Sequence, residues 1–393
     1  MHLLFTQTAY PPSMGGAQLH QHLLAQTLLM SHDIQVVSQW NNNRTDWLLG
    51  TTLCAPSQGQ DYSINGVNVH CIGLSVRDKI CLIPSVLLYY PFMKAALPSI
   101  VACLDAHLQA FGDKADLIHN VRIGREGLSY ASMQVARKKG IPFVLTPIHH
   151  PRWVGWRYRE YIKLYTMADA VLALTNVEKL TLISLGVREN RITVSGTGPI
   201  LASQAYPENF TSGYGIKGPM VLFIGQHYAY KGYKELLKAM PFVWRKVPEA
   251  EFVFIGPAIG DSEEEFTANP DKRIHRLGNV DLQTKTDALA ACALLCLPST
   301  QESFGIVYTE AWSFGKPVIG CNIPAVAEVI NEGLDGFLVA QEPAPIAESI
   351  LDLLLNPGLA ANLGTAGKRK VAERYTWKQV AARTEHAYKS IEN

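Results

Sequence analysis

Short apolar runs alternate with amphipathic stretches along most of the chain. This alternation predicts βα units stacked into parallel sheets. In the first half the runs that predict strands are residues 1–6, 33–38, 116–120, 142–147, 170–175 and 192–195. Helical periodicity between them covers residues 17–29 and 127–140. The first half should therefore form a doubly wound α/β domain.

The alternation stops over residues 202–218, a stretch rich in Gly, Pro, Ser and Asn that predicts a linker. It then resumes, with helices expected to start at Lys231 and Ser303. The strands predicted in this second half are residues 220–225, 251–256, 273–278, 293–298, 317–321 and 336–339. The terminal stretch has the periodicity of a strongly amphipathic helix.

The length of 393 residues, 48% of them hydrophobic, is enough for two full cores. We predict an N-terminal domain of residues 1–202, completed by a helix over 377–393, and a C-terminal domain of residues 203–376. Domains of this type bind ligands at the carboxyl ends of their strands, facing a crevice.

The formal net charge of +1 is unevenly distributed along the chain. Residues 1–200 hold 17 Lys and Arg against 12 Asp and Glu, or +5, and the remainder holds 18 against 22, or −4. A basic first half indicates an anionic partner, such as a phospholipid surface or a phosphorylated acceptor. Uneven surface charge without function explains the counts equally well. The sequence has no basic run with interleaved aromatics, so a nucleic-acid partner is not expected.

The seven cysteines show no C-x-x-C spacing, which is typical of a reducing compartment. Cys292 and Cys296 fall in an apolar run and should pack as small hydrophobic residues. The first residues indicate a strand rather than a signal peptide. The apolar stretch 80–100 is interrupted by prolines and a lysine, so it falls short of the ~20 clean residues of a spanning helix. We expect a cytoplasmic protein, with a peripheral position at the inner face of the plasma membrane as a further option.

The strongest motif is residues 296–321, CLPSTQESFGIVYTEAWSFGKPVIGC. A strand should end here and a helix should begin, with Ser303 as its N-cap. The free amides of the first turn and the helix dipole form an anion site suited to a diphosphate. Gly305 would let the ligand approach the backbone closely.

Glu302 and Glu310 lie eight residues apart within this motif. Eight helical residues rise ~12 Å, which is too far for the carboxylate pair of a glycosidase. The spacing suits one extended ligand, with a sugar and a ribose at its ends and a diphosphate between, because each carboxylate can accept hydrogen bonds from a diol. An ordinary loop Glu and an ordinary helical Glu explain the spacing alone just as well.

The motif resembles the E-x7-E region of retaining GT-B glycosyltransferases of family 4, P-S-x-x-E-x-F-G…E-A…G-x-P-V-I. The resemblance extends over nearly the whole chain. It includes the Gly-Gly loop after the first strand, the TNVEKLTLISLGV…RITVSGTG and LFIG…KG segments, and the closing YTW helix. It implies a GT-B fold: two facing Rossmann-like domains with doubly wound parallel sheets and a C-terminal helix that crosses back to the N-terminal domain.

The resemblance also implies roles for the motif. The glutamate that matches Glu302 contacts hydroxyls of the donor sugar, and the one that matches Glu310 contacts the ribose. The backbone amides of Phe304, Gly305 and Ile306 would face the donor sugar and its phosphates. The family transfers a sugar with retention of configuration and without a metal, and the chain holds no Asp-x-Asp, so no metal or other cofactor is expected.

A second element is VLFIGQHYAYKGYKELL, whose strand should end at Gly225. Lys231 follows, and a cation there can neutralise a departing nucleoside diphosphate. The family usually carries an Arg directly after the glycine and a Lys about five residues later. Lys231 matches, but Gln226 stands where the Arg is expected. His227 or a cation of the first domain would then have to compensate; a solvated Lys at a helix start is the alternative for Lys231.

Two elements of the first domain complete the candidate site. Gly15 and Gly16 precede a helix and permit close approach to phosphate or acceptor, without the G-x-G-x-x-G fingerprint of dinucleotide binding. His149 and His150 follow a strand, and in the family a histidine here contacts the donor. Pro151 restrains His150 to an extended backbone, which favours His150 as the one that faces the ligand.

Two further patterns have structural as well as functional explanations. An aromatic and basic cluster follows the histidines and either binds a lipid phosphate or acceptor sugar, or belongs to a buried helix with extended arginines. Its members are Arg152, Trp153, Trp156, Arg157 and Arg159. Thr175 and Glu178 have the spacing of a capping box.

The sequence therefore predicts a retaining hexosyltransferase that uses a nucleoside diphosphate sugar. UDP-glucose is the first expectation for the donor and GDP-mannose the second, and the acceptor would be a glycan or lipid-linked glycan in polysaccharide or glycolipid assembly. A sugar-nucleotide epimerase is the nearest rival. A nicotinamide oxidoreductase is disfavoured by the missing fingerprint, and a sugar-nucleotide sensor would bind the donor without turnover.

Overall fold

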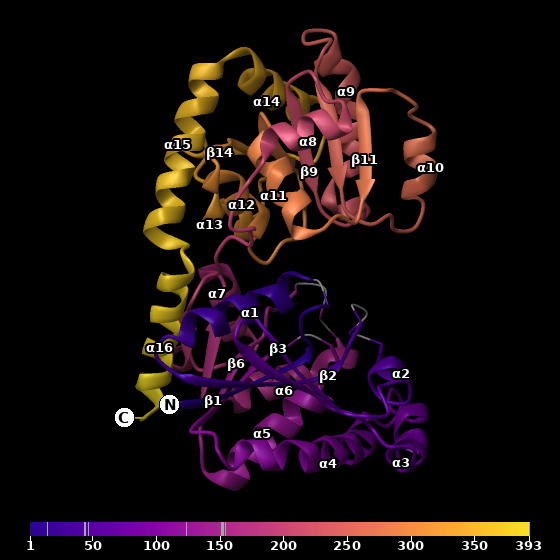
Figure 1. Cartoon of the computed structure of the whole chain (residues 1–393), viewed down its shortest axis with the longest axis vertical. Helices are drawn as coiled ribbons and strands as arrows, with labels where there is room; N and C mark the ends of the chain where they lie inside the picture. The colour runs from indigo at the N-terminus through magenta and orange to yellow at the C-terminus, as the bar shows by residue number, and fades with distance from the viewer. Residues whose placement is uncertain are drawn as a thin grey trace. The chain divides into compact units, whose positions relative to one another are not determined.

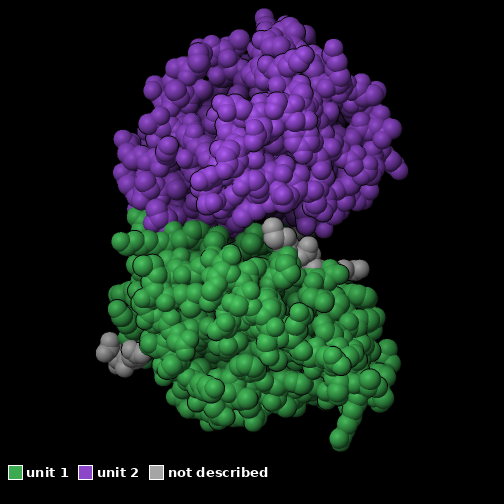
Figure 2. All heavy atoms as spheres, viewed as in Figure 1, with its two compact units in different colours: residues 1–197, 377–393 green, residues 198–376 purple. Residues whose placement is uncertain are grey.

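A computed structural model describes residues 1–392 except 14, 43, 44, 46, 123, 151, 152 and 154. The chain forms two compact units (Figures 1 and 2). Unit 1 comprises Met1–Thr197 and Trp377–Asn393, and unit 2 comprises Gly198–Thr376. The change of unit thus falls a few residues before the boundary predicted at 202.

Unit 1 is built on a mostly parallel sheet in the order β3-β4-β2-β1-β5-β6-β7-β8. The strands predicted from the sequence are β1 (His2–Ala9), β2 (Asp33–Trp40), β5 (Leu117–Val121), β6 (Phe143–Thr146), β7 (Ala170–Ala173) and β8 (Ile192–Val194). The residues of β1, β2, β5, β6 and β7 are almost all buried, because a parallel sheet is covered on both faces, whereas in the edge strand β8 only Ile192 is buried. The doubly wound architecture is confirmed.

The sheet edge differs from the all-parallel prediction. β3 (Gln60–Ile64) and β4 (Val67–Cys71) form an antiparallel hairpin that the apolar pattern did not predict. Asn65 and Gly66 make the turn with φ of 48° and 83°, the left-handed conformation that a two-residue hairpin loop requires. The Asn-Gly dipeptide was the available signal for this hairpin.

The helices of unit 1 are α1 (Gly16–Leu28), α2 (Leu48–Thr51), α3 (Val76–Leu87), α4 (Met93–Gly112), α5 (Gly127–Lys139), α6 (Arg159–Met167), α7 (Asn176–Ser184) and α16 (Trp377–Glu392), with 3₁₀ turns at Trp156–Tyr158 and Glu189–Arg191. The apolar stretch 80–100 lies in α3 and α4, which pack against each other (Figure 1). Across the described residues, no helix combines the length and the apolar composition that a bilayer crossing needs.

The C-terminal helix α16 belongs to unit 1, as the resemblance implied. Its Tyr388 hydroxyl lies 2.7 Å from His119 Nδ1, and His119 Nε2 lies 2.8 Å from Thr146 Oγ1. Burial lowers the pKa of His119 to about 3, so this buried polar chain is neutral. Arg383 donates from Nε to the Ser195 carbonyl at 2.8 Å. These bonds hold the last helix on the core of the first unit.

Unit 2 contains a parallel sheet in the order β11-β10-β9-β12-β13-β14. Its strands are β9 (Met220–Ile224), β10 (Glu251–Ile255), β11 (Ile274–Gly278), β12 (Leu294–Leu297), β13 (Val318–Cys321) and β14 (Gly336–Val339). The strand order reverses between β9 and β12, and the loops at such a reversal form the ligand crevice of doubly wound folds. Cys292 and Cys296 are fully buried in this core.

The helices of unit 2 are α8 (Pro207–Tyr214), α9 (Tyr233–Trp244), α10 (Ser262–Thr267), α11 (Leu282–Ala291), α12 (Ile306–Ser313), α13 (Pro324–Val329), α14 (Pro343–Leu355) and α15 (Pro357–Arg374), with a 3₁₀ turn at Ala229–Lys231.

The linker predicted at 202–218 is wrong. This stretch contains α8, which packs on α11 and has Phe210 buried. The backbone N–H of Tyr206 donates to Asp287 Oδ1 at 2.7 Å, which fixes the entry into α8. Proline at the first turn and Gly215 at the C-cap mark the two ends of a short helix, and they do not indicate a flexible linker.

Candidate functional site

The loops that follow β9 and β12 lie at the point in unit 2 where the strand order reverses. Lys231 comes from the first loop and Glu302 from the second. Lys231 Nζ lies 2.5 Å from Glu302 Oε1, and both side chains are mostly buried. The structure thus brings together two predicted residues that lie 71 positions apart in the chain.

Backbone contacts hold these two loops against each other. The Thr300 N–H donates to the Tyr230 carbonyl at 2.8 Å. Gln341 Nε2 donates to the carbonyls of Tyr230 and Pro298 at 2.9 and 2.7 Å. Gly232 has φ of +83°, and a Cβ there would lie 2.6 Å from the Pro298 carbonyl oxygen. Only glycine fits this close approach. These contacts fix the backbone of the loop that carries Lys231.

Glu310 lies in α12 and forms the second ion pair of the site. Its Oε1 accepts from Lys285 Nζ at 2.7 Å and from the backbone N–H of Ile200 at 3.3 Å. The carboxylate side chain is only 2% exposed. Its other oxygen, Oε2, is buried without a hydrogen-bond partner among the described residues. A buried carboxylate oxygen in that state is costly, and a ligand hydroxyl is the kind of donor that would satisfy it.

Lys285, on α11, was not singled out in the sequence. A buried acid such as Glu310 usually has a cationic partner, and this rule was the available signal. It does not identify which lysine is the partner, and Lys285 is 25 positions from Glu310 in the sequence.

The N-terminus of α12 differs from the sequence prediction. The N-cap is Gly305, with φ of +81°, and not Ser303. A Cβ on Gly305 would lie 2.3 Å from Tyr308 Cε2, and the Tyr308 hydroxyl is fixed by a 2.8 Å bond to the Leu297 carbonyl. The Tyr308 N–H donates to the Gly305 carbonyl at 3.0 Å, and because no side chain caps this helix, the N–H groups of Ile306 and Val307 can face an anion.

Phe304 presents only its backbone to this region. Its ring is buried in edge contact with Tyr375, with ring centroids 5.3 Å apart. The predicted contact through the Phe304 amide is compatible with this arrangement, because a buried ring leaves the main chain of the loop in place.

Gln226 and His227 occupy different environments after β9. Gln226 is exposed, whereas His227 is 1% exposed within a shell of aromatic rings. The rings are those of Phe223, Tyr233, Phe254 and Phe266. Burial, with a smaller effect of Arg276, lowers the pKa of His227 to about 4. A neutral, enclosed imidazole does not supply the charge of the missing arginine, which disfavours His227 as its replacement.

The strand order of unit 1 also reverses, between β1 and β5. Gly15 is the N-cap of α1 in an extended conformation, and the helix begins at Gly16. A Cβ on Gly15 would meet only the end of the Gln18 side chain. Gln7 Nε2 from β1 donates to the Ala17 carbonyl at 2.9 Å. The glycine pair therefore stands at the carboxyl end of a central strand.

His149 and His150 follow β6, and they differ in burial. His149 is 5% exposed, whereas His150 is half-buried. Burial, aided by the charge of Arg122, lowers the pKa of His149 to about 4. Ile148, just before, has φ of +46°, which is strained for a β-branched residue. Pro151, the basis for favouring His150, lies outside the described residues.

Arg122 directly follows β5 and was missed in the sequence. Its guanidinium lies between two rings, with its Cζ 3.6 Å from the Trp153 ring centroid and 3.5 Å from that of Tyr161. The side chain is 3% exposed. A cation placed directly after a buried apolar strand was the signal in the sequence.

The remaining members of the aromatic and basic cluster lie at the surface. Trp156 is half exposed, and the Arg157 guanidinium lies 5.5 Å from its ring centroid. Arg159 pairs with Glu160 at 3.4 Å. Arg152 lies outside the described residues.

Glu178 does not complete the predicted capping box. The Thr175 hydroxyl accepts from the Glu178 N–H at 3.0 Å, which is half of the motif. The Glu178 carboxylate turns instead to the backbone N–H groups of Leu174 and His149, at 2.7 and 2.6 Å. Glu178 therefore connects α7 to the loop that carries the histidines.

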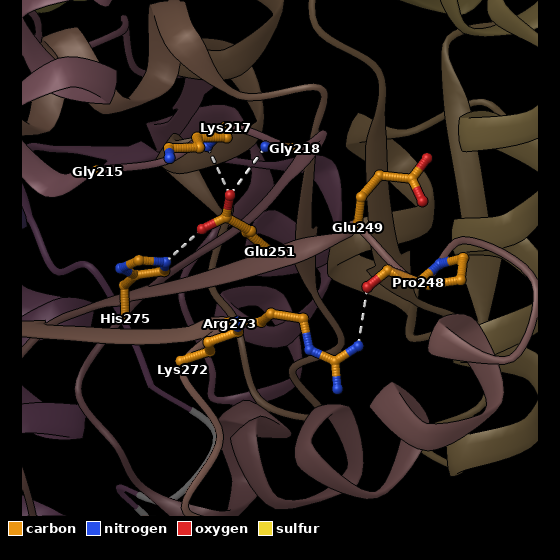
Figure 3. Close-up of a pocket in the computed structure, with 9 residues that line it drawn as sticks. All are labelled: Gly215, Lys217, Gly218, Pro248, Glu249, Glu251, Lys272, Arg273 and His275. Carbon is orange, nitrogen blue, oxygen red and sulfur yellow. Dashed lines mark hydrogen bonds and ion pairs between the residues drawn. The ribbon is translucent and has the colours of Figure 1, made fainter.

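A pocket of about 450 Å³ lies at the opposite end of the unit 2 sheet, at the amino ends of β9, β10 and β11 (Figure 3). Glu251 accepts there from the N–H groups of Lys217 and Gly218, and its other oxygen lies 2.6 Å from His275 Nε2. These polar groups satisfy one another, so we place the candidate site at the carboxyl ends of the strands.

Comparison with known proteins agrees with this placement. The family model of the glycosyl transferases group 1 matches residues 218–356, the segment that holds Lys231, Glu302 and Glu310. Among solved structures, Anabaena HepE in complex with UDP-glucose has a TM-score of 0.74 at 18% identity and covers 98% of this chain and 99% of its own. Sucrose-phosphate synthase from Thermosynechococcus elongatus has a TM-score of 0.75 at 17% identity, covering 99% and 98%. These likenesses show the fold.

Curated relatives are more similar in sequence over a shorter length. A phosphatidyl-myo-inositol mannosyltransferase of Mycobacterium tuberculosis is 31% identical over 186 residues, which cover 46% of this chain and 49% of the relative. A D-inositol 3-phosphate glycosyltransferase of Streptomyces avermitilis is 30% identical over 180 residues, covering 42% and 39%. The matches thus span half or less of the relatives' length. Residues 218–356 thus match the glycosyl transferases group 1 family, and the whole chain has the fold of the two solved structures.

Proposed function

We propose that the protein transfers a hexose, with retention of configuration, from a nucleoside diphosphate sugar to an acceptor hydroxyl. One observation carries the proposal: two lysine–glutamate pairs and an uncapped helix N-terminus occur together where the strand order of unit 2 reverses. All of them lie within the segment that matches the family model.

The residues of unit 2 fit the parts of such a donor. Glu310 Oε2 would accept a hydrogen bond from a ribose hydroxyl, and Glu302 would accept from hydroxyls of the sugar. The amides of α12 and Lys231 would hold the diphosphate. Lys231 has three N–H donors, so it can keep its bond to Glu302 and still donate to a phosphate oxygen.

For the donor we favour mannose carried by GDP over glucose carried by UDP. The support is that a curated relative at 31% identity is a mannosyltransferase. The UDP-glucose complex of Anabaena HepE supports the fold alone, at 18% identity. The inositol-containing acceptors named for both curated relatives carry a phosphate, which agrees with the basic first half of this chain.

The bond changes can proceed without a protein nucleophile. As the bond from the sugar carbon to the diphosphate oxygen breaks, the acceptor oxygen attacks from the same face, and the departing phosphate takes the acceptor proton. Lys231 would stabilise the charge that develops on the leaving group. We assign acceptor binding to unit 1, where His149 is a neutral hydrogen-bonding group.

A donor panel tests the proposal. The purified protein is incubated with GDP-mannose, UDP-glucose or their parent nucleotides and a crude lipid or glycan acceptor, and release of nucleotide is followed with product NMR. Acceptor-dependent release of GDP and an α-linked product support the proposal. Donor conversion without an acceptor indicates an epimerase, and binding without turnover indicates a sensor; either contradicts it.

The same assay tests metal independence. Lys231 would supply the positive charge at the diphosphate, so neither Mg²⁺ nor Mn²⁺ should raise the rate of chelator-treated protein. Transfer that is lost with the chelator and restored by Mg²⁺ or Mn²⁺ would show that Lys231 does not carry this role.

We also propose that the acceptor is reached at an anionic membrane surface through α3. Val76, Ile80, Ile83 and Leu87 repeat at helical spacing, and they are 66%, 60%, 41% and 70% exposed. Four exposed apolar side chains on one helical face form the surface of an interfacial helix. Residues 76–95 hold three basic residues and one acidic residue, or +2, which complements anionic lipid.

Vesicle co-sedimentation tests this surface. The protein should bind vesicles that contain phosphatidylglycerol and not purely zwitterionic ones. Leu87→Asp should weaken binding, whereas Leu180→Asp, at a residue 65% exposed on α7, should not. Equal binding by all three proteins would contradict the assignment of α3.

A further inference from the structure

Helices α3 and α4 of unit 1 bring together side chains that the proposed transfer does not use. Asp78 comes from α3, and Cys103 and His107 come from α4. The carboxylate oxygen, the thiol sulfur and the ring nitrogen all lie within 4.8 Å of one another. A carboxylate, a thiolate and an imidazole are the three ligand types that Zn²⁺ takes in proteins.

The spacing on each helix favours a common ligand. Cys103 and His107 are four residues apart, so they share one face of α4. Asp78 and Cys81 are three residues apart, so they share one face of α3. The Cys81 thiol is close enough to Cys103 that its charge helps to raise the pKa of Cys103 to about 11, after the larger effect of burial and that of Asp78. Two helical pairs thus offer four ligands.

We propose that Asp78, Cys81, Cys103 and His107 form a tetrahedral zinc site that connects α3 to α4. Bound sulfur and nitrogen ligands stand about 3.5 Å apart around zinc. The ligand atoms of Asp78, Cys103 and His107 therefore have to close by roughly one ångström, which χ rotation supplies for partly exposed groups, and the Cys81 thiol has to turn in from α3 to join them. Binding would release the protons of the two thiols.

Asp78 is already oriented for this role. Its Oδ2 accepts hydrogen bonds from the Ser75 N–H at 2.9 Å and from the Ser75 hydroxyl at 2.6 Å. Both bonds end on the same oxygen, so Oδ1 can turn to the metal. Hydrogen bonds of this kind orient ligating carboxylates.

The site would also hold α3, a helix with few buried residues, against α4. Of the twelve residues of α3, only Leu82 and Val86 are buried. A metal bond to α4 would replace the missing apolar contacts and fix the exposed face of α3. This role is structural and does not depend on the proposed transfer reaction.

Cobalt spectroscopy on protein without a histidine tag tests the site. Reduced, chelator-treated and desalted protein is titrated with Co²⁺. We expect one equivalent to bind with thiolate charge-transfer absorption, and Zn²⁺ to displace it. Cys103→Ser and His107→Ala should each weaken binding by more than roughly a hundredfold, since loss of a supporting partner alone costs 10–100-fold.

Cys54→Ser is the matched control, because Cys54 is another exposed thiol, and it should bind the metal like the wild type. Zn²⁺ should raise the melting temperature of the wild type and of Cys54→Ser, and not that of Cys103→Ser. Circular dichroism of the metal-free variants checks their folding. Cobalt binding without thiolate absorption, affinity unchanged in Cys103→Ser, or a Cys81–Cys103 disulfide in protein isolated with alkylated thiols would overturn the proposal.

Discussion

The Glu178 carboxylate accepts a hydrogen bond from the His149 backbone N–H at 2.6 Å. Its second oxygen accepts from the Leu174 N–H at 2.7 Å. One buried acid therefore connects the ends of β6 and β7. Ile148, directly before His149, is held at φ of +46°. The bond offsets part of that backbone strain, so Glu178 positions the loop that carries both histidines.

Glu178→Gln tests this positioning. An amide presents only one acceptor oxygen, so one of the two backbone N–H groups loses its partner. The loss of a hydrogen bond to a charged group is worth about 1.5–3 kcal/mol. Transfer by the variant should fall through kcat more than through KM for the donor, because the donor contacts that we propose are on unit 2. An unchanged kcat would contradict a positioning role.

The same pair makes a prediction about pH. Burial raises the pKa of Glu178 from 4.5 to about 7, against the opposing effect of its two N–H donors. Between these values the native protein binds more protons than the unfolded chain, so the stability from this carboxyl is present below pH 4.5 and lost as pH rises to 7. The free energy of unfolding of the wild type should fall relative to Glu178→Gln over this window in urea titrations. A relative gain would show that the N–H donors outweigh burial.

Gly305→Ala tests the N-terminus of α12. Gly305 and Gly315 flank the same helix, with φ of +81° and +68°. A Cβ on Gly305 would strike the Tyr308 ring, whereas a Cβ on Gly315 has nothing within 4 Å. Gly315→Ala should cost about 1 kcal/mol from the left-handed backbone alone. Gly305→Ala should cost about 1–3 kcal/mol more through overpacking. Equal losses in denaturant would show that Tyr308 yields without cost.

Lys231→Ala tests the stabilisation of the leaving group. The diphosphate gains charge as the bond breaks, so a fixed cation contributes more in the transition state than in the ground state. With Gln226 in place of the family's arginine and His227 neutral, we expect kcat to fall by on the order of a hundredfold or more. The donor KM should rise less. Lys238→Ala, on the exposed side of α9, is the control. A steep rise in KM with kcat unchanged would make Lys231 a binding residue only.

The sequence predicted the central strands because each is buried on both faces and so is a continuous apolar run. β9 and β10 are buried at every position. The hairpin was not predicted because each strand has only five residues, and neither is a continuous apolar run: β3 has no buried position, and β4 alternates buried with more exposed ones. α8 was not predicted because its sequence has the composition of a loop, and the helix is stabilised by packing on α11.

The candidate site divides in the same way. Glu302, Glu310 and Lys231 stand in motifs with fixed spacing, so the sequence was enough to select them. Lys285 and Arg122 have no such motif. Each is defined by a partner brought close by folding: a buried carboxylate for Lys285, and two aromatic rings for Arg122. The periodicity of apolar residues does not predict contacts between residues that are distant in the sequence.

Calorimetric titration of the wild type and of Glu310→Gln with GDP, followed by UDP, tests the central claim most directly. Glu310 Oε2 is buried and lacks a partner among the described residues, and we assign it to the ribose. The wild type should bind GDP more tightly than UDP. Glu310→Gln should bind GDP roughly ten- to hundredfold more weakly, as expected for the loss of a charged hydrogen bond worth ~1.5–3 kcal/mol. Equal GDP affinity in the two proteins, or no nucleotide binding by the wild type, would contradict the assignment of this site.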